Sequence, residues 1–412
     1  MIRNRKRVLF FAEAVTLAHV ARPLVLAESL NADHYEIVMA SAPRYRDFYI
    51  GKPWQTIPLE SISSQQFLHS ISRGSPVYNT RTLRRYVKND LEIIEKANPD
   101  VIVGDFRLSL SVSARIVEIP YITITNAYWS SYYTGSRFPL PVLPMTKILP
   151  LALAEAVFRL TLPLAFMLHC APLNRVRREN GMASLGAELR RIYTDADYVL
   201  FADIPELFPT ANLPAEHQYL GPILWSAPVA KPAWWNHLPT HNPLIYLTLG
   251  SSGQARLLPI VLDALGKLPV TVIAATVETY TGPIPMNAYL TNYLPGADAT
   301  MLVRMVICNG GSPTSLQALA AGVPVLGIAS NADQFLNMEA LTRAGTGMVM
   351  RADRVNSRAI GEAVEKILFS QEFSSNAIEV AGKIKNYNAP QRFARFMEEL
   401  GDKNSRHKQP QP

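Results

Sequence analysis

The feature that most restricts the fold is the repeated alternation of short apolar segments with segments of helical periodicity. In the first half of the chain, an apolar stripe from Leu83 to Ile94 has helical spacing and ends at Asn98-Pro99. Short apolar runs that are typical of buried strands lie before and after it, at Val8–Val15, Glu36–Ala40, Val101–Val103, Tyr121–Ile124 and Tyr198–Ala202. Strands that alternate with helices predict a parallel sheet covered by helices on both faces.

A Pro-rich stretch between Gly221 and Pro243 divides the chain into two such halves. Its crowded prolines and weak periodicity predict a semi-rigid linker. A second series of strands follows, at Leu244–Leu249, Val270–Ala274, Met305–Cys308 and Val323–Ile328. A chain of 412 residues is long enough for two cores. We therefore predict an α/β chain with one Rossmann-like domain at 1–221, a linker at 222–243, a second such domain at 244–401 and a disordered tail at 402–412.

Charge and cysteine content limit the classes of partner. The net charge of +7 is concentrated in part at the two ends, in Arg3–Arg7 and Lys403–Lys408, which we interpret as solubilising tails and not as a nucleic-acid interface. The apolar stretch after Arg7 is short and contains Glu13, so it predicts a first buried strand and not a leader. Two distant cysteines favour a reducing compartment, here the cytoplasm, over disulfides or a zinc site.

The segment from Pro139 to Pro172 is rich in Leu, Ala, Pro and Phe, and charged residues are sparse in it. Helices packed on the domain surface are the favoured interpretation. Two alternatives stay open: a lid over an acceptor site, or a surface that makes peripheral contact with a membrane. No uncharged run reaches the length of a bilayer span.

The most specific local pattern is a strand followed by two glycines and a helix start. The strand ends at Cys308, Asn309-Gly310-Gly311 follows, and Ser312-Pro313 is the combination expected at an N-cap and first helical position. Free N–H groups at such a helix start favour a phosphate. A second turn with small residues, Leu249–Gly253, follows another strand of the same sheet. Because ligands bind at the carboxyl ends of parallel strands, the two turns predict one anion-binding crevice.

These motifs resemble those of the bacterial macrolide and plant natural-product glycosyltransferases, which are inverting, nucleotide-sugar-dependent enzymes of the GT-B fold. The resemblance is clearest in Asn309–Thr314, in Ala318–Pro324 and in Asp333–Asn337, and it is weaker at Ala18-His19-Val20 and Gly104-Asp105. It implies two Rossmann-like domains whose parallel sheets face an interdomain cleft. It also implies transfer of a hexose from a nucleotide-sugar, with UDP as the expected nucleotide, to a hydroxyl of an apolar small molecule or lipid.

The resemblance places His19 as the general base and Asp105 as the carboxylate that orients it. Physical chemistry agrees with these roles, because a neutral imidazole can remove the proton of an attacking alcohol and a carboxylate can fix its tautomer. The aromatic residues Tyr128 and Trp129 are candidates for the acceptor pocket, although they serve equally well as core residues.

The resemblance likewise implies a donor site in the second domain. The diphosphate would lie at the two turns, the nucleobase against an aromatic ring, and the sugar hydroxyls at an Asp-Gln pair. The implied donor-binding residues are Gly250, Ser251, Tyr293, Asn309, Gly310, Gly311, Ser312, Thr314, Gln317, Asp333 and Gln334. No cofactor beyond the nucleotide-sugar is implied, and no metal, because amides and the helix dipole would stabilise the leaving diphosphate.

The sequence departs from the family pattern at three positions. Asn309 replaces a usual histidine, Gln317 replaces a usual ribose-binding glutamate, and Ala18 replaces a usual glycine. Because these changes weaken the expected donor contacts, two alternatives remain: a catalytically degenerate protein that binds nucleotide or acts as a scaffold for a partner, and a GT-B nucleotide-sugar epimerase.

Overall fold

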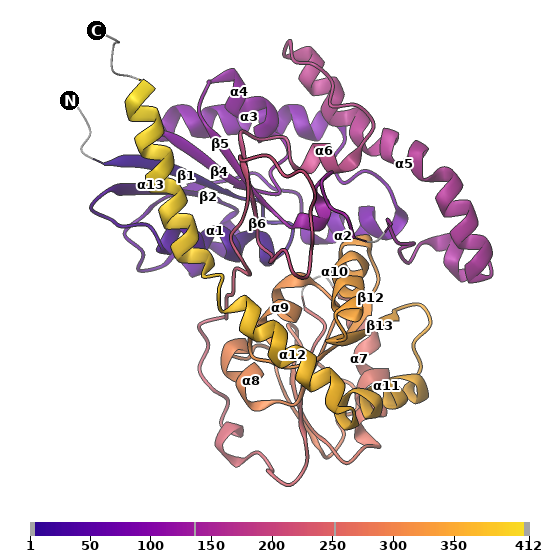
Figure 1. Ribbon diagram of the computed structural model, residues 1–412. Coiled ribbons are helices and arrows are strands. Elements are labelled where there is room, and N and C mark those ends of the chain that lie inside the picture. Colours follow the sequence, from indigo (N-terminus) through magenta and orange to yellow (C-terminus); the bar gives the residue numbers. More distant parts are fainter. Residues whose placement is uncertain (1–4, 136, 251–252, 408–412) are drawn as a thin grey trace.

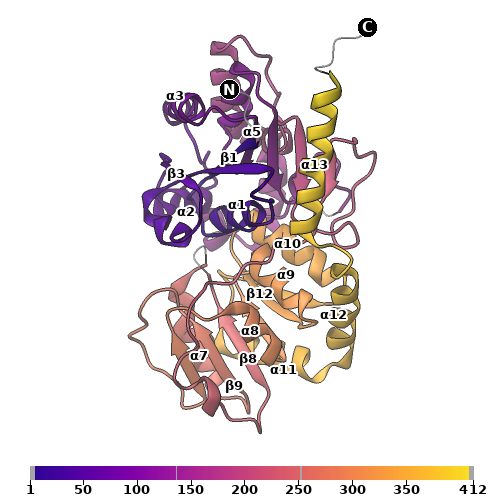
Figure 2. The same ribbon diagram turned by 90° about the vertical axis from the view of Figure 1, so that its left-hand side faces the viewer.

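The chain folds into two α/β lobes that face each other across a cleft, as seen in a computed structural model (Figures 1 and 2). The structure describes residues 5–135, 137–250 and 253–407, with the backbone alone for 402–407. The predicted α/β architecture with two Rossmann-like lobes is confirmed. The prediction for Ser251 lies outside the described residues.

The first lobe is built on a seven-stranded sheet in the order β3-β2-β1-β4-β5-β6-β7, in which every pair is parallel. Its strands are β1 (Lys6–Ala12), β2 (Tyr35–Ser41), β3 (Gln55–Pro58), β4 (Val101–Asp105), β5 (Tyr121–Thr125), β6 (Tyr198–Phe201) and β7 (His217–Tyr219). β1 shows why the sequences of the central strands are continuous apolar runs. Phe10 belongs to the core on one face of the sheet, and Phe11 to the core on the other.

Helices cover both faces of this sheet (Figure 1). They are α1 (Ala18–Glu28), α2 (Ser64–Arg73), α3 (Thr80–Ala97), α4 (Leu110–Ile116), α5 (Leu151–Glu179) and α6 (Leu189–Tyr193). The Asn79 side chain caps α3 by accepting a hydrogen bond from the Thr82 N–H. α3 ends at Asn98, which has a left-handed conformation before Pro99, as the sequence predicts.

The second lobe has a six-stranded parallel sheet in the order β10-β9-β8-β11-β12-β13. The strands are β8 (Leu244–Thr248), β9 (Thr271–Ala275), β10 (Ala288–Thr291), β11 (Met305–Cys308), β12 (Val325–Ala329) and β13 (Gly347–Arg351). The helices are α7 (Leu258–Gly266), α8 (Gly296–Leu302), α9 (Ser312–Ala320), α10 (Ala332–Arg343), α11 (Ser357–Phe369), α12 (Gln371–Ile384) and α13 (Ala389–His407).

The last helix returns to the first lobe. Phe393, Phe396 and Met397 of α13 pack into the core formed by β1 and α1, and Figure 2 shows α13 alongside that lobe. The sequence-based division assigned residues 244–401 to the second domain, so the structure moves the α13 portion to the first. The apolar stripe of α13 explains the placement, because it is buried only against this core. Residues 402–407 continue the helix and are not a disordered tail, and residues 408–412 lie outside the described residues.

The segment from Pro139 to Pro172 contains most of one long helix, α5. Its last turns pack in the first lobe through Cys170, Leu173 and Val176. Its first half projects at the edge of the molecule (Figure 1). Before α5, the chain lies against the second lobe, where the Val142 N–H donates to the Ser330 carbonyl at 2.7 Å and Arg351 donates to the Leu140 carbonyl at 2.7 Å. This segment is therefore shared between the lobes.

Candidate active site

The predicted base and its carboxylate meet at the carboxyl ends of two neighbouring strands. His19 is the second residue of α1, which begins shortly after β1, and Asp105 is the last residue of β4. β1 pairs with β4, so that Ala12 lies opposite Asp105. His19 Nδ1 lies 2.7 Å from Asp105 Oδ1. With its proton on Nδ1, His19 would donate to this carboxylate and keep Nε2 as the basic nitrogen.

Arg22 joins this pair, and sequence reasoning missed it. Its guanidinium donates to both oxygens of Asp105, from Nε to Oδ2 at 2.7 Å and from Nη2 to Oδ1 at 2.8 Å, and Nη1 donates to Asn126 at 3.0 Å. Burial alone would raise the pKa of Asp105, but the charges of Arg22 and His19 outweigh burial and lower it. The available signal was the spacing, since Arg22 lies one helical turn after His19 on the same face of α1.

Phe106 follows Asp105 and packs against the imidazole. Its backbone has a φ of 58°, a left-handed conformation that is strained for a bulky residue. The phenyl ring stacks on His19 with a centroid distance of 4.8 Å and an interplanar angle of 18°. The turn after β4 therefore orients two neighbours of His19, its carboxylate and its stacking partner.

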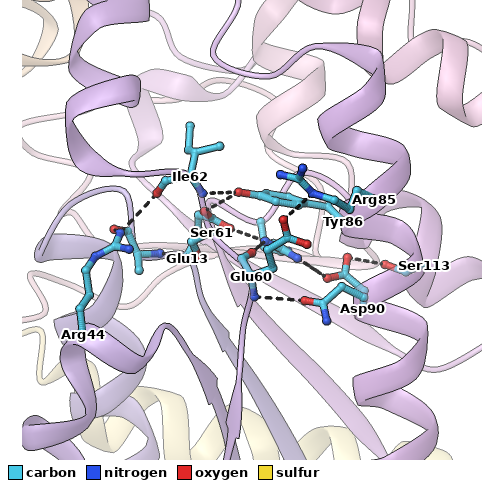
Figure 3. A network of polar contacts seen from close by, with 12 residues as sticks. Glu13, Arg44, Glu60, Ser61, Ile62, Arg85, Tyr86, Asp90 and Ser113 are labelled. Carbon is cyan, nitrogen blue, oxygen red and sulfur yellow. Dashed lines mark hydrogen bonds and ion pairs between the residues drawn. The ribbon is translucent and has the colours of Figure 1, made fainter.

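A buried ionic network anchors the next residue of the same turn (Figure 3). Arg107 lies between two carboxylates, with Nη1 2.7 Å from Glu13 Oε2 and Nη2 2.8 Å from Asp90 Oδ1. Its guanidinium also lies 3.6 Å from the centroid of the Tyr86 ring. Ser113 donates to the second oxygen of Asp90 at 3.0 Å. Because these three charged side chains are fully buried, the network fixes the backbone that follows Asp105.

One cavity of about 450 Å³ extends between the lobes and brings the two predicted halves of the site together. The first lobe contributes His19, Asp105 and Trp129 to its lining, and the second contributes Gly311, Ser312, Asp333 and Gln334. Much of the remaining wall is apolar and comes from α2, the segment before α5, and α5 itself; examples are Phe67, Ile71, Phe138, Leu143, Phe158 and Phe166. A polar end near His19 therefore adjoins an apolar chamber.

The two predicted phosphate-binding turns lie next to each other at the carboxyl ends of β8 and β11, the two central strands of the second sheet. Gly310 has a φ of 80° and Gly250 a φ of 63°, so both positions favour glycine. A Cβ added to Gly250 would lie 3.3 Å from Asn309 Nδ2. Asn309 Oδ1 accepts from the Gly311 N–H at 3.0 Å. The structure corrects one detail: Gly311 is the N-cap of α9, whereas Ser312 is its first helical residue, and Thr314 lies in the same first turn.

The Asp-Gln pair occupies the start of α10, and its two side chains have different surroundings. Asp333 Oδ1 accepts hydrogen bonds across the cleft from the Trp129 Nε1–H at 2.8 Å and the Tyr128 hydroxyl at 3.0 Å. Gln334 is buried and completes the capping box with Asn331, and its Oε1 accepts from the Ser330 N–H at 2.8 Å. Asp333 is thus the member of the pair that interacts with the opposite lobe.

Six of the predicted donor residues lie outside the cavity lining formed by the described residues, namely Gly250, Tyr293, Asn309, Gly310, Thr314 and Gln317. Gln317 Nε2 donates to the carbonyl of Trp225, a linker residue, at 3.1 Å. Tyr293 follows β10, and its side chain is partly exposed.

Tyr128 is fully buried and belongs to the core between the lobes, whereas Trp129 both packs on that core and lines the cavity.

Asp203 is a buried acid behind the cavity that the sequence analysis also missed. It accepts hydrogen bonds from Asn126 Nδ2 at 2.8 Å and from the Ala127 N–H. Burial raises its pKa to about 7, although the hydrogen bonds and Arg22 oppose the shift. Asn126 also donates to Ser312 across the cleft at 3.3 Å. Asp203 therefore supports a residue that connects the lobes.

We expect Asp203→Asn to remove a pH dependence of stability. The pKa of Asp203 is raised in the folded protein, so its contribution is complete below the unfolded pKa near 4 and is lost as the pH rises through 7. The wild-type free energy of unfolding should fall by about 1–4 kcal/mol more than that of the variant between pH 5 and pH 8. Urea unfolding at both pH values measures this difference. An equal change in the free energy of unfolding of the two proteins between pH 5 and pH 8 would contradict the prediction.

The chain is similar to known proteins over most of its length. A family model described as "Erythromycin biosynthesis protein CIII-like, C-terminal domain" matches residues 259–400. A "PGL/p-HBAD biosynthesis glycosyltransferase" of Mycobacterium tuberculosis is 51% identical over 381 residues, which cover 92% of this chain and 89% of the relative. The chain belongs to the PGL/p-HBAD biosynthesis glycosyltransferase family. It is therefore a glycosyltransferase by descent, and the predicted resemblance to macrolide glycosyltransferases is confirmed.

Other members and neighbours of this family differ in what their names state. A "PGL/p-HBAD biosynthesis rhamnosyltransferase" of Mycobacterium bovis is 49% identical over 92% of this chain and 84% of its own length. A relative of the same species named as inactive is 52% identical over 65% of this chain and 72% of its own. The solved "Spinosyn Rhamnosyltransferase SpnG" covers 95% of this chain and 100% of its own with a TM-score of 0.70 at 18% identity. This last likeness shows the shared GT-B fold.

Proposed function

We propose that this glycosyltransferase moves a hexose from a nucleotide-sugar to a hydroxyl group of an apolar acceptor, with His19 as the general base and inversion at the anomeric carbon. The observation that carries the proposal is the shared cavity, in which the His19–Asp105 pair and the N-terminus of α9 line the same space. An acceptor hydroxyl at His19 Nε2 would attack while the diphosphate leaves toward the α9 amides. Attack and departure on opposite faces invert the configuration.

We place the diphosphate at the N-terminus of α9 because the leaving group gains negative charge as it departs. The first N–H groups of a helix have no intrahelical partners and carry partial positive charge, so they stabilise the charge that develops on a departing diphosphate. Gly310 and Gly311 allow a close approach of the ligand to the backbone. The proposal needs no metal ion and no cofactor besides the nucleotide-sugar. Two buried, free cysteines, Cys170 and Cys308, are compatible with a reducing, cytoplasmic location.

The names of similar proteins narrow the donor. One relative is named a rhamnosyltransferase, and the spinosyn rhamnosyltransferase has been solved with thymidine diphosphate. The sequence prediction favoured UDP, so both nucleotides belong in the test. Thermal unfolding with UDP, TDP and their hexose and deoxyhexose derivatives will identify the donor, because a ligand of the native state raises the apparent melting temperature. Absence of any shift would contradict the donor assignment.

Asp333 is the candidate for the sugar hydroxyls, and Asp333→Ala tests it. Hydrogen bonds to a charged group contribute about 1.5–3 kcal/mol, so the KM for the nucleotide-sugar should rise by roughly tenfold to a hundredfold. Trp129→Phe removes the indole N–H that donates to Asp333 across the cleft but keeps the carboxylate. A rise in the donor KM that occurs in Asp333→Ala and not in Trp129→Phe therefore reports loss of sugar binding and not loss of the contact between the lobes. The matched control is Asp298→Ala, on the surface of α8. An unchanged donor KM in Asp333→Ala would exclude Asp333 from the donor site.

Two alternatives make different predictions for the same assays. A degenerate scaffold would bind nucleotide without hydrolysing or transferring the sugar, and the relative named as inactive, together with Asn309 and Gln317, motivates this alternative. An epimerase would convert the nucleotide-sugar without any acceptor. Mass spectrometry of reactions with a panel of alkylphenols and aliphatic alcohols identifies a transferase, because only a transferase forms a glycoside. Proton NMR of the nucleotide-sugar after reaction without acceptor separates an epimerase from a scaffold, because epimers have the same mass.

A further inference from the structure

Helix α5 has two apolar faces: one lines the cavity, and the other is left exposed by the residues that the structure describes. Its inner face lines the cavity through Phe158, Thr161, Leu162, Ala165, Phe166 and His169. Its outer stripe, on the opposite side of the helix at 3.6 residues per turn, consists of Leu153, Leu160, Leu164, Met167 and Leu168. Leu160 is 83% exposed, and each of the other four is about half exposed. A helix that is apolar all round is normally buried or in contact with lipid.

The composition of α5 indicates that it contacts lipid, and its packing in the first lobe indicates whether it lies along the membrane or spans it. By length and composition α5 is apolar enough to cross a bilayer, yet only 11% of its most apolar window is buried in the protein. Its last turns are nevertheless fixed in the first lobe, where Cys170 and Leu173 are fully or almost fully buried. A helix anchored in this way, with one face on the cavity between the lobes, fits a position in the membrane interface and not across it.

The charges around the outer stripe match an anionic surface. Lys147 lies just before α5, Arg159 lies within it, and Arg175 and Arg178 lie in its last turns, all with exposed side chains. Two acidic residues on the helix, Glu155 and Glu179, pair with Arg159 and Arg175. An excess of exposed cations beside an apolar stripe attracts anionic lipid headgroups, and burial of the Leu and Met side chains in the acyl region strengthens the contact.

We infer that the outer stripe of α5 docks on an anionic lipid bilayer, so that an apolar acceptor passes from the bilayer to His19 along the inner face of the same helix. The inference rests on the proposed function for the role of the cavity. The same helix would then insert its Leu160 and Leu164 side chains into the bilayer, while its Phe158 and Phe166 side chains form part of the wall of the acceptor chamber. An acceptor with a long apolar tail could enter this chamber without crossing water.

Vesicle flotation tests the docking surface directly. Wild-type protein should float with phosphatidylglycerol vesicles, and less with phosphatidylcholine vesicles or in high salt. The variant Leu160→Gln/Leu164→Gln/Met167→Gln should lower the bound fraction by on the order of tenfold. The matched control is Met286→Gln/Met301→Gln/Phe369→Gln, which alters three side chains at least as exposed but far from α5 in the sequence. Equal binding of wild type and the α5 variant would overturn the inference.

Activity assays separate this inference from the proposed function. With a short, water-soluble acceptor, wild type and both triple variants should transfer sugar at similar rates. With a long-chain acceptor embedded in phosphatidylglycerol vesicles, only the α5 variant should lose about tenfold or more of its rate. Failure of every protein with every acceptor would refute the proposed function and leave the flotation result to decide the docking. A dimer in light scattering that the α5 variant dissociates, together with no flotation of wild type, would overturn the docking in favour of a second copy.

Discussion

His19→Ala is expected to lower the rate of sugar transfer by about three orders of magnitude, since general-base catalysis contributes on the order of 10²–10⁴-fold. The methyl group of alanine cannot accept the proton of the attacking hydroxyl. The binding of nucleotide should persist, because the α9 N-terminus and the glycine turns belong to the other lobe. Transfer rates at saturating donor, combined with calorimetric titration of the nucleoside diphosphate, measure the two properties separately.

His169 offers a matched control for this experiment. It also lines the cavity, but it lies on α5, and its Nδ1 is 2.7 Å from the Ala165 carbonyl, one turn earlier in the helix. His169→Ala should therefore retain transfer within a few-fold of wild type. Wild-type turnover in His19→Ala would exclude His19 as the base. An equal loss in both variants would instead indicate that the cavity is sensitive to any change in its wall.

Arg107→Met is expected to destabilise the first lobe by about 3–5 kcal/mol, the range measured when one partner of a buried ion pair is removed. The variant leaves Glu13 and Asp90 buried without a cation. Methionine fills most of the volume of arginine, so the loss reports charge more than packing. Urea unfolding at neutral pH measures the change. Because Arg107 anchors the turn after Asp105, transfer should also decline at temperatures where the variant is still folded.

The pH dependence of this loss follows from the two carboxyl groups. Burial raises the pKa of Glu13 and of Asp90 above their ordinary values even in the presence of Arg107. Removal of the Arg107 charge should raise both pKa values further. A raised pKa in the folded state gives stability that is present at low pH and is lost as the pH rises through that pKa. The deficit of Arg107→Met should therefore be smaller at pH 5 than at pH 8. The triple variant Glu13→Gln/Asp90→Asn/Arg107→Met should recover stability at pH 8, and a deficit equal to that of Arg107→Met would contradict the electrostatic explanation.

The central strands were predictable because they are buried on both faces. β1, β4, β5, β8, β11 and β12 all appear in the sequence as apolar runs within a few residues of their observed bounds. The strands that the sequence analysis missed are the four edge strands of the two sheets, β3, β7, β10 and β13. All four residues of β10 are only partly buried, so no continuous apolar run marks that strand. Periodicity cannot distinguish such a strand from a loop.

The site was predictable where one local motif determines one contact, and not where distant segments meet. The glycine turn before α9 could be placed from its local motif, and the His19–Asp105 pair from the resemblance to the family. Arg22 and Asp203 could not, because their partners are distant: Asp105 and Asn126 lie 83 and 104 positions from Arg22, and Asn126 lies 77 positions from Asp203. A charged residue on a helix is usually solvated, so the spacing of one helical turn from His19 did not by itself distinguish Arg22. The roles of the predicted donor residues stay predictions until the variants described above are measured.

The return of α13 to the first lobe has a mechanical consequence. The chain crosses between the lobes twice, in the linker after Gly221 and again at Tyr387, between α12 and α13. The two crossings touch, since a Cβ built on Gly221, whose φ is 100°, would lie 2.4 Å from Tyr387 Cβ. A contact this close leaves room for glycine alone. We therefore expect the lobes to swing about this point like a pivot, so that the side of the cleft far from Tyr387 opens widest and admits both substrates.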